Sequence, residues 1–207
     1  MKALYLSIFV LLAAVSATAQ IRPVESLPIA VNYSKTIHLI FPSAVKYSQA
    51  VTDFVAVDNP ENVPHILRIK ANSKSFSKQT TVSVATEGGF FYSFNVSYAD
   101  SLEQTNYFLP DMRSIAPDTV FINEVSQTHL IAPEKVIYID YGDTCINVSK
   151  AENTENIIRM IARSGRVQQF PKQTNVSFAT ESGRFFTFNV DYREKPEAFV
   201  YEVGELS

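Results

Sequence analysis

The sequence contains very little cysteine, histidine, glycine and tryptophan, and each shortage narrows what the protein can be. Its 207 residues include one Cys, three His, six Gly and no Trp. A single cysteine, Cys145, excludes an internal disulfide, and such a free cysteine is most often a small buried apolar residue. The alternative is a mixed disulfide with a partner protein. The histidines lack the HxH or HExxH spacing of metal sites, so we predict no bound metal.

Motifs of the common catalytic and cofactor sites are also missing. The chain has no GxSxG, no phosphate-binding P-loop and no GxGxxG. Glu87 and Glu181 occupy equivalent turn positions, where a solvated residue is a simpler interpretation than one half of a catalytic carboxylate pair. The net charge is only -3 and no basic stripe is present, so we expect no direct contact with nucleic acid. These observations predict a protein that is not an enzyme, with no catalytic residue and no cofactor.

Long apolar runs are absent except at the start of the chain. Lys2 precedes an apolar stretch over residues 3–15, and the small residues Ala17-Thr18-Ala19 precede Gln20. This pattern predicts a signal peptide over residues 1–19, cleaved between Ala19 and Gln20, and an exported protein in the periplasm or at the outer membrane. A retained membrane anchor is the alternative, but the run is shorter than the roughly 20 residues that span a bilayer. We expect no transmembrane segment in the mature chain.

Aromatic residues are abundant, with 15 Phe and 10 Tyr, and many of them fall in a stretch that occurs twice. Residues 79–98 (QTTVSVATEGGFFYSFNVSY) and 173–192 (QTNVSFATESGRFFTFNVDY) align without a gap at a displacement of 94 positions. Each copy has the period of two of a strand on either side of a short turn, with Gly183 free to adopt a positive φ. The repeat predicts a tandem duplication of a small β domain.

Alternation within the repeat separates a core face from an opposite face. The predicted core residues are Tyr92, Phe94, Val96 and Tyr98 in one copy and Phe186, Phe188, Val190 and Tyr192 in the other. Asn95 and Asn189 lie on the opposite face, and we expect each to bond to neighbouring backbone, with a ligand or partner contact as the alternative. His38 alternates with the core residues of its own strand and is predicted to be a surface residue.

The remaining segments predict further strands. The fold class is therefore all-β, with two tandem small β-sandwich-like domains over residues 20–102 and 131–207, joined by an ordered linker with one short strand at 103–130. We match KVIYIDY (135–141) to KTIHLIF (35–41). Residues 157–162 match 66–71 as a strand, although a short helix over 152–163 is the alternative. The predicted additional strands are 35–41, 44–47, 54–57, 66–71, 118–122, 135–141, 144–148, 157–162 and an edge strand near 199–203.

Two triplets near the linker are candidate modification sites. Asp100-Ser101-Leu102 and Asp118-Thr119-Val120 have the Asp-Ser/Thr-aliphatic form of the acceptor in periplasmic O-glycosylation of Bacteroidetes. Ser101 and Thr119 are therefore candidate O-glycosylation sites, and unmodified surface residues are the alternative.

One family resembles these patterns. KTIHLIFPSAVKY (35–47), ENVPHILRIKA (61–71) and TVSVATEGGFFYSFNVSYAD (81–100) resemble the N-terminal domain of the conjugative transposon TraN family of Bacteroidetes. TNVSFATESGRFFTFNV is more distantly similar to CagX-like subunits of type IV secretion outer-membrane rings. The resemblance implies an exported all-β structural part of a conjugation channel, without catalysis. The family's longer C-terminal domain has no counterpart here, and a second copy of the N-terminal unit stands in its place.

The predicted function is thus that of an exported, non-enzymatic structural or interaction protein in a conjugative transfer assembly. Its partners would be other envelope or conjugation-machinery proteins, with an oligomer as an option. Edge-strand addition to the repeated hairpins is the expected mode of contact. The alternative is a secreted or surface glycan-binding or adhesin-like module that uses exposed aromatics such as Tyr107 and Phe108. An enzyme would require a cleft between the domains.

Overall fold

The computed structural model describes residues 24–204 and confirms the all-β prediction. Within this part of the chain the regular structure consists of strands β1 to β16 and one short 3-10 turn, η1 (Val167–Gln169). No helix in the described range is long and apolar enough to cross a membrane. The predicted signal peptide and its cleavage site at Ala19 and Gln20 lie outside the described residues.

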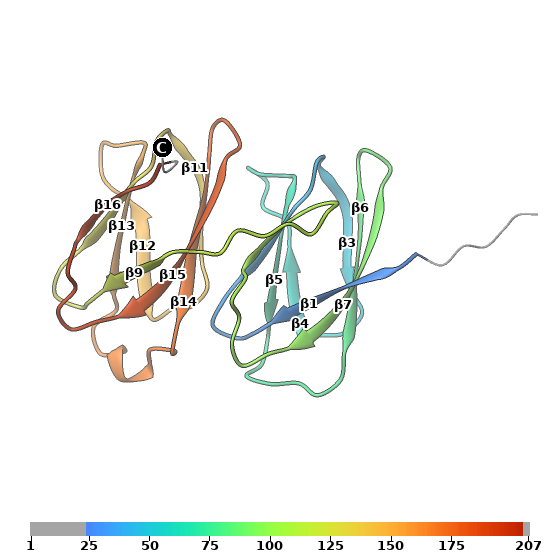
Figure 1. The fold of residues 1–207 in the computed structure, drawn as a ribbon, viewed down its shortest axis with the longest axis horizontal. Helices are drawn as coiled ribbons and strands as arrows, with labels where there is room; N and C mark the ends of the chain where they lie inside the picture. Colours follow the sequence, from blue (N-terminus) through green and yellow to red (C-terminus); the bar gives the residue numbers. More distant parts are fainter. Residues whose placement is uncertain (1–23, 205–207) are drawn as a thin grey trace, which may run out of the picture.

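The first domain is a sandwich of two four-stranded sheets (Figure 1). One sheet has the order β1-β7-β6-β3 and the other β4-β5-β2-β8. Strands β2, β4 and β5 oppose β3, β6 and β7, as strands B, D and E oppose C, F and G in immunoglobulin sandwiches. The bounds are β1 Ser26–Val31, β2 Ile37–Ile40, β3 Val45–Ala50, β4 Val55–Asp58, β5 Ile66–Ala71, β6 Thr80–Thr86, β7 Phe91–Tyr98 and β8 Asn106–Phe108.

The second domain repeats this plan strand for strand. Its sheets have the orders β9-β15-β14-β11 and β16-β10-β13-β12. The bounds are β9 Thr119–Ile122, β10 Thr128–Ile131, β11 Val136–Tyr141, β12 Ile146–Lys150, β13 Ile157–Ala162, β14 Thr174–Thr180, β15 Phe185–Tyr192 and β16 Val200–Glu202. Even the irregularities coincide, because the register shift between Val45 and Tyr47 in β3 recurs between Val136 and Tyr138 in β11.

The repeated hairpins form the centre of one sheet in each domain. Strand β6 pairs with β3 and β7 pairs with β1, and β14 and β15 are flanked in the same way by β11 and β9. The turns hold Gly89 and Gly183 at φ +80° and +83°, a conformation that favours glycine, so the expected positive φ at Gly183 is confirmed. Because both neighbours are in place, neither hairpin has an open edge for a partner strand.

The interpretation of residues 103–130 as a linker with one strand does not match the structure, which places three strands there. Strand β8 pairs in parallel with β2 and completes the first domain, whereas β9 and β10 belong to the second. Only residues 109–118 connect the two sandwiches. The one strand predicted there, at 118–122, is β9, whereas β8 and β10 were missed. The partners of β8 and β9 lie far away in sequence, so local pattern does not assign these strands to a domain.

The match of KVIYIDY to KTIHLIF was also wrong. Residues 136–141 form β11, which pairs with β14 as β3 pairs with β6. The counterpart of β2 is β10, so His38-Leu39-Ile40 corresponds to His129-Leu130-Ile131 at a displacement of 91 positions. Alternating apolar residues are common to all these strands, and only the pairing partner identifies each one.

The strand interpretation of residues 157–162 holds, and the helix alternative does not. Ile158, Met160 and Ala162 of β13 are buried at every second position, which is the strand period. Cys145 is buried with 2% of its surface exposed, as the sequence predicted for a small apolar residue. Each domain has its own hydrophobic core, and the predicted core face of each hairpin lines it or packs against it.

Each core contains one fully buried aromatic side chain, Phe94 in β7 of the first domain and Phe178 in β14 of the second. We expect Phe178→Ala to lower the free energy of unfolding by about 3–5 kcal/mol because it removes apolar contacts and leaves a cavity. Urea unfolding monitored by circular dichroism measures this change. Phe90→Ala is the control, since Phe90 is 59% exposed, and a loss of similar size there would contradict the assignment of the core.

Candidate functional site

The polar side chains best able to carry chemistry gather where the two domains meet. The sheet β4-β5-β2-β8 of the first domain faces the sheet β9-β15-β14-β11 of the second (Figure 1). Antiparallel sheets commonly keep one face in water. Here every residue of β2 and every residue of β14 is buried. Both strands are therefore covered by a domain core on one face and by the neighbouring domain on the other.

The centre of this domain interface is apolar. Ile40, Val63 and Ile66 from the first domain form one buried cluster with Tyr138 and Ala179 from the second. Aromatic residues at the border of the cluster, including Phe108 and Phe185, are partly buried. The domains are thus held together by removal of apolar surface from water as well as by polar contacts.

His38 lies next to this apolar centre and is completely buried, so its predicted surface position was wrong. Its Nε2 is 3.1 Å from the Tyr138 hydroxyl and 3.5 Å from Asp140 Oδ2. Arg68 donates to Asp140 Oδ1 at 2.7 Å and also contacts Asp58. The alternation in β2 correctly placed His38 away from the core of its own domain, but the second domain covers that face.

Burial determines the protonation of this cluster. It lowers the pKa of His38 to about 4, with Asp140 opposing the shift and Arg68 adding to it. Burial also raises the pKa of the Tyr138 hydroxyl, and here the charge of Asp140 adds to the shift. At neutral pH the imidazole and the phenol are both uncharged, and they are used for contacts across the interface.

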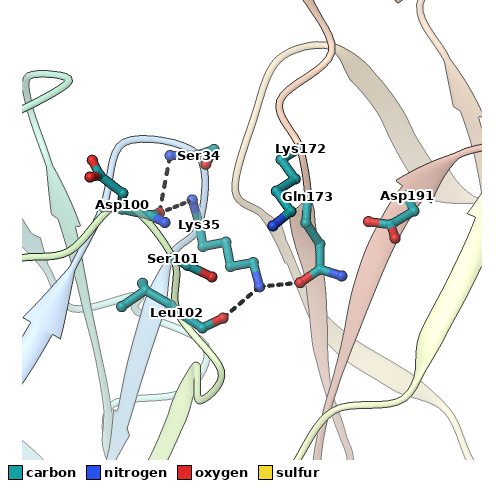
Figure 2. Close-up of a pocket in the computed structure, with 9 residues that line it drawn as sticks. Ser34, Lys35, Asp100, Ser101, Leu102, Lys172, Gln173 and Asp191 are labelled. Carbon is teal, nitrogen blue, oxygen red and sulfur yellow. Dashed lines mark hydrogen bonds between the residues drawn. The ribbon is translucent and has the colours of Figure 1, made fainter.

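Lys35 forms a second polar group at the rim of the interface, in a cavity of about 300 Å³ (Figure 2). Its ammonium group donates to the Leu102 carbonyl at 2.9 Å, to Gln173 Oε1 at 2.5 Å and to Asn189 Oδ1 at 2.8 Å. Burial lowers the pKa of Lys35 to about 8, and Asp191 partly opposes this shift. Lys35 therefore connects the end of the first sandwich to two residues of the repeated hairpin in the second.

Asn175 binds the first domain as a neighbouring strand would. Its Oδ1 accepts from the backbone N–H of Thr36 at 3.0 Å, and its Nδ2 donates to the Thr36 carbonyl at 2.9 Å. Thr174 donates to the Ser34 carbonyl at 2.7 Å. The backbones approach closely here, because a Cβ at Gly142 would lie 2.5 Å from the Ser34 carbonyl oxygen. Glycine is therefore required at position 142 for this fit.

The two equivalent asparagines of the hairpins differ in their surroundings. Asn189 accepts from Lys35 and donates to the Pro117 carbonyl at 3.4 Å, so the expected backbone bond is accompanied by a contact to the other domain. Asn95 is exposed. The identity of these residues in both copies therefore reflects a shared face of the hairpin that is covered in only one domain.

The other residues singled out in the sequence lie apart from this interface cluster. Glu87 and Glu181 are exposed at the hairpin turns of different domains. Tyr107 and Phe108 are half-buried in β8 and pack against the first core and the interface respectively, so they are not the exposed aromatics of a glycan-binding surface. Residues 24–204 contain no group of three or more His, Cys, Asp or Glu side chains placed to hold a metal.

A larger cavity of about 610 Å³ lies beside the interface, where the segment after β8 passes over β15. Ile115 borders it on one side and Phe185, Phe186 and Phe188 border it on the other.

One family model matches both halves of the chain, over residues 29–102 and 120–196, and its description is "Domain of unknown function (DUF8473)". The chain belongs to this family. It carries one copy of the DUF8473 domain in each sandwich, and the matched segments leave out β8 and β16. No curated protein matches the chain.

Several solved structures are similar at low identity. They include the titin Ig tandem domains A164-A165 (10% identity, 86% of this chain and 95% of that chain, TM-score 0.24). A second is an endo-fucoidan hydrolase of glycoside hydrolase family 107, with 8% identity over 87% of this chain and 28% of that chain and a TM-score of 0.27. A third is the Bacteroides ovatus mixed-linkage glucan utilization locus protein SGBP-B, with 11% identity over 84% of this chain and 46% of that chain and a TM-score of 0.23. The chain spans less than half of the last two proteins, and TM-scores this low carry no argument about function.

The buried histidine makes the stability of the protein depend on pH. Because folding depresses the pKa of His38, the unfolded chain binds the extra proton, and stability falls as the pH decreases from about 6.5 towards about 4. We expect a loss of about 2 kcal/mol between about pH 7.5 and about pH 5 from this residue. Urea unfolding at a series of pH values should show that His38→Gln flattens this dependence. His129→Gln, the matched change in the second domain, should leave it intact, and an equal slope in wild type and His38→Gln would contradict the assignment.

The candidate glycosylation sites differ in accessibility, and modification stays a prediction. Ser101 is exposed and borders the smaller cavity. Thr119 in β9 is half-buried and pairs with Asn189 in β15. We therefore expect a glycan at Ser101 rather than at Thr119 in protein purified from its native host. Intact mass spectrometry should detect the added mass and its loss in Ser101→Ala, with Thr119→Ala as the control. An unmodified mass of the cleaved chain would contradict it.

Proposed function

We propose that the protein is an exported, non-enzymatic structural component that works by protein–protein contact in an envelope assembly. This proposal rests on one observation: the reactive side chains at the domain interface bond to one another. His38, Tyr138, Asp140 and Arg68 contact one another across the domain interface, and Lys35 binds three acceptors there. These groups serve to fix one domain against the other.

A fixed arrangement of two domains suits a structural role. Domains within one chain move relative to one another by default unless their interface is large and apolar. This interface combines an apolar centre with polar bonds at Thr36, Lys35 and Arg68 that require a defined register. We infer that the two sandwiches behave as one elongated body that presents its outer sheets to partners.

Contact with partners would involve sheet faces rather than the hairpin edges. The hairpin strands have neighbours on both sides, which removes the basis for edge-strand addition to them. The edge strands β3 and β11 carry a register irregularity, a feature that discourages pairing with a further strand. Contact would instead use the outer faces of the sheets β1-β7-β6-β3 and β16-β10-β13-β12, which neither domain covers.

The proposed setting is a conjugative transfer apparatus, with other envelope or conjugation-machinery proteins as partners. The resemblance of residues 35–47, 61–71 and 81–100 to the TraN family supports this setting. The predicted signal peptide supports a location in the periplasm or at the outer membrane. The family match leaves this setting open, since its description assigns no function.

Deletion of the gene from its native host tests this function. We expect the frequency of conjugative transfer to fall by at least about tenfold, with restoration by the full gene on a plasmid, because an assembly lacking a structural part would not form its contacts. Complementation with a gene lacking residues 1–19 is the matched control and should fail if export is required. Unchanged transfer in the deletion strain would contradict the conjugative setting.

A further inference from the structure

The domain interface joins two different faces of one repeated domain. The second domain contributes the outer face of β11, β14 and β15, called here the docking face and centred on Tyr138, Ala179 and Phe185. The first domain contributes the outer face of β5 and β2, called here the receiving face and centred on His38, Ile40 and Ile66. Because the domains are repeats, each also has a copy of the other's face. Those two copies are uncovered.

The docking face of the first domain keeps the central residues of its counterpart. Tyr47, Ala85 and Phe91 lie in one cross-strand row, as Tyr138, Ala179 and Phe185 do. Tyr47 is 46% exposed and Phe91 is 51% exposed, whereas Tyr138 is 8% exposed and Ala179 is 0% exposed. The same residue types are therefore covered by a domain in one copy and left in water in the other.

Small polar residues surround this row in both copies. Positions that are buried at the interface in β14 are half-exposed in β6, although the side chains remain similar in size and polarity. The equivalent pairs are Thr81 and Asn175, Ser83 and Ser177, Ser93 and Thr187, and Asn95 and Asn189.

The receiving face of the second domain matches its counterpart even more closely. His38 pairs with Arg68 and Ile40 with Ile66 in the first domain; His129 pairs with Arg159 and Ile131 with Ile157 in the second. All four residue types are unchanged, and the four residues of the second domain are only half-buried. A second docking face would therefore meet the same side chains, in the same register, on this receiving face.

We propose that the docking face of one molecule binds the receiving face of a second copy, so that the chain associates head to tail. This contact would repeat between molecules the interface that joins the domains within a molecule. Tyr47 would contact His129 of the next copy, and Phe91 would lie against its Ile131 and Ile157. The exposed aromatic patch and the identical receiving residues select this occupant over an unrelated protein.

The two faces lie at opposite ends of the molecule. In Figure 1, strands β3, β6 and β7 are at one end of the longest axis and β12, β13 and β16 are at the other. Binding between different faces is heterologous, and it continues from copy to copy unless the rotation between copies closes a ring. The inference therefore predicts short filaments rather than a closed symmetric dimer.

Several substitutions make the contact between molecules weaker than the one within the chain. Within the chain, Arg68 forms an ion pair with Asp140. In the contact between molecules, Arg159 would face the uncharged Gln49 instead, and Ser126 would replace Lys35. Val51 in the first domain is the counterpart of Gly142 in the second, since the N–H of Val51 donates to β6 as that of Gly142 donates to β14. Gly142 fits closely against the Ser34 carbonyl, and Val51 has a side chain at this position. The second copy must therefore sit slightly further away at this edge. The segment that connects the two domains also gives them a high effective concentration for one another, which two separate molecules do not have.

Sedimentation velocity of the mature protein over micromolar to millimolar concentrations tests the proposal. We expect concentration-dependent association, and we expect Phe91→Glu and Ile157→Glu each to weaken it at least about tenfold by placing a charge in the contact. Ile115→Glu, an equally charged change at another exposed apolar residue, should have no effect. Val51→Gly should strengthen association, since it removes the side chain that Gly142 lacks. If Ile157→Glu does not fold, as judged by its melting temperature, Arg159→Glu replaces it.

Mixing the two defective variants identifies the geometry. Phe91→Glu keeps an intact receiving face and Ile157→Glu keeps an intact docking face, so an equimolar mixture should form a dimer and nothing larger. A monomer at every concentration, association that persists in Phe91→Glu, or a mixture that stays monomeric would each overturn the proposal. The inference rests on the repeat and the interface rather than on conjugation, so its failure would leave the transfer experiment unaffected.

Discussion

Burial of both faces of β2 and β14 is the constraint on which the structure depends. A strand in an antiparallel sandwich normally carries apolar residues towards the core and polar residues towards water. Here the water-facing side of each strand is closed by the other domain. Each polar group on that side then requires a partner, because an unpaired buried polar group costs about 1–3 kcal/mol. Asn175 in β14 meets this requirement through its two bonds to the Thr36 backbone, and His38 Nε2 in β2 meets it through the Tyr138 hydroxyl. His38 Nδ1 has no hydrogen-bond partner and retains that cost.

The duplication shows that burial is not fixed by the residues of a strand alone. Tyr47 and Tyr138 occupy equivalent positions in equivalent strands, but only Tyr138 is covered. His38 and His129 differ in the same way. The pattern of alternation determines which side chains leave the domain core, and it is identical in both halves. What those side chains meet outside the core depends on the order of the domains.

This distinction explains which parts of the fold could be predicted from the sequence. The hairpins and the strands at 66–71 and 157–162 follow from local alternation and from the repeat, so their positions were correct. Strands β8 and β9 have three or four residues and pair in parallel with distant segments, and local pattern does not reveal such pairing. The interface was missed because a face covered by another domain has the same polar composition as a face in water. The recurrence of His-Leu-Ile at residues 38–40 and 129–131 was the available signal, and the incorrect match of 135–141 concealed it.

Differences between the two copies give direction to the packing of the domains. Two repeated domains could pack in more than one way, because each carries both kinds of face. The arrangement in the structure is the one that pairs Arg68 with Asp140 and seats Gly142 beside Ser34. With the roles of the domains exchanged, Arg159 would meet the uncharged Gln49, and Val51 would be pressed against the backbone. Charge and steric fit thus select one orientation within the chain. The apolar residues common to both copies supply attraction without that preference.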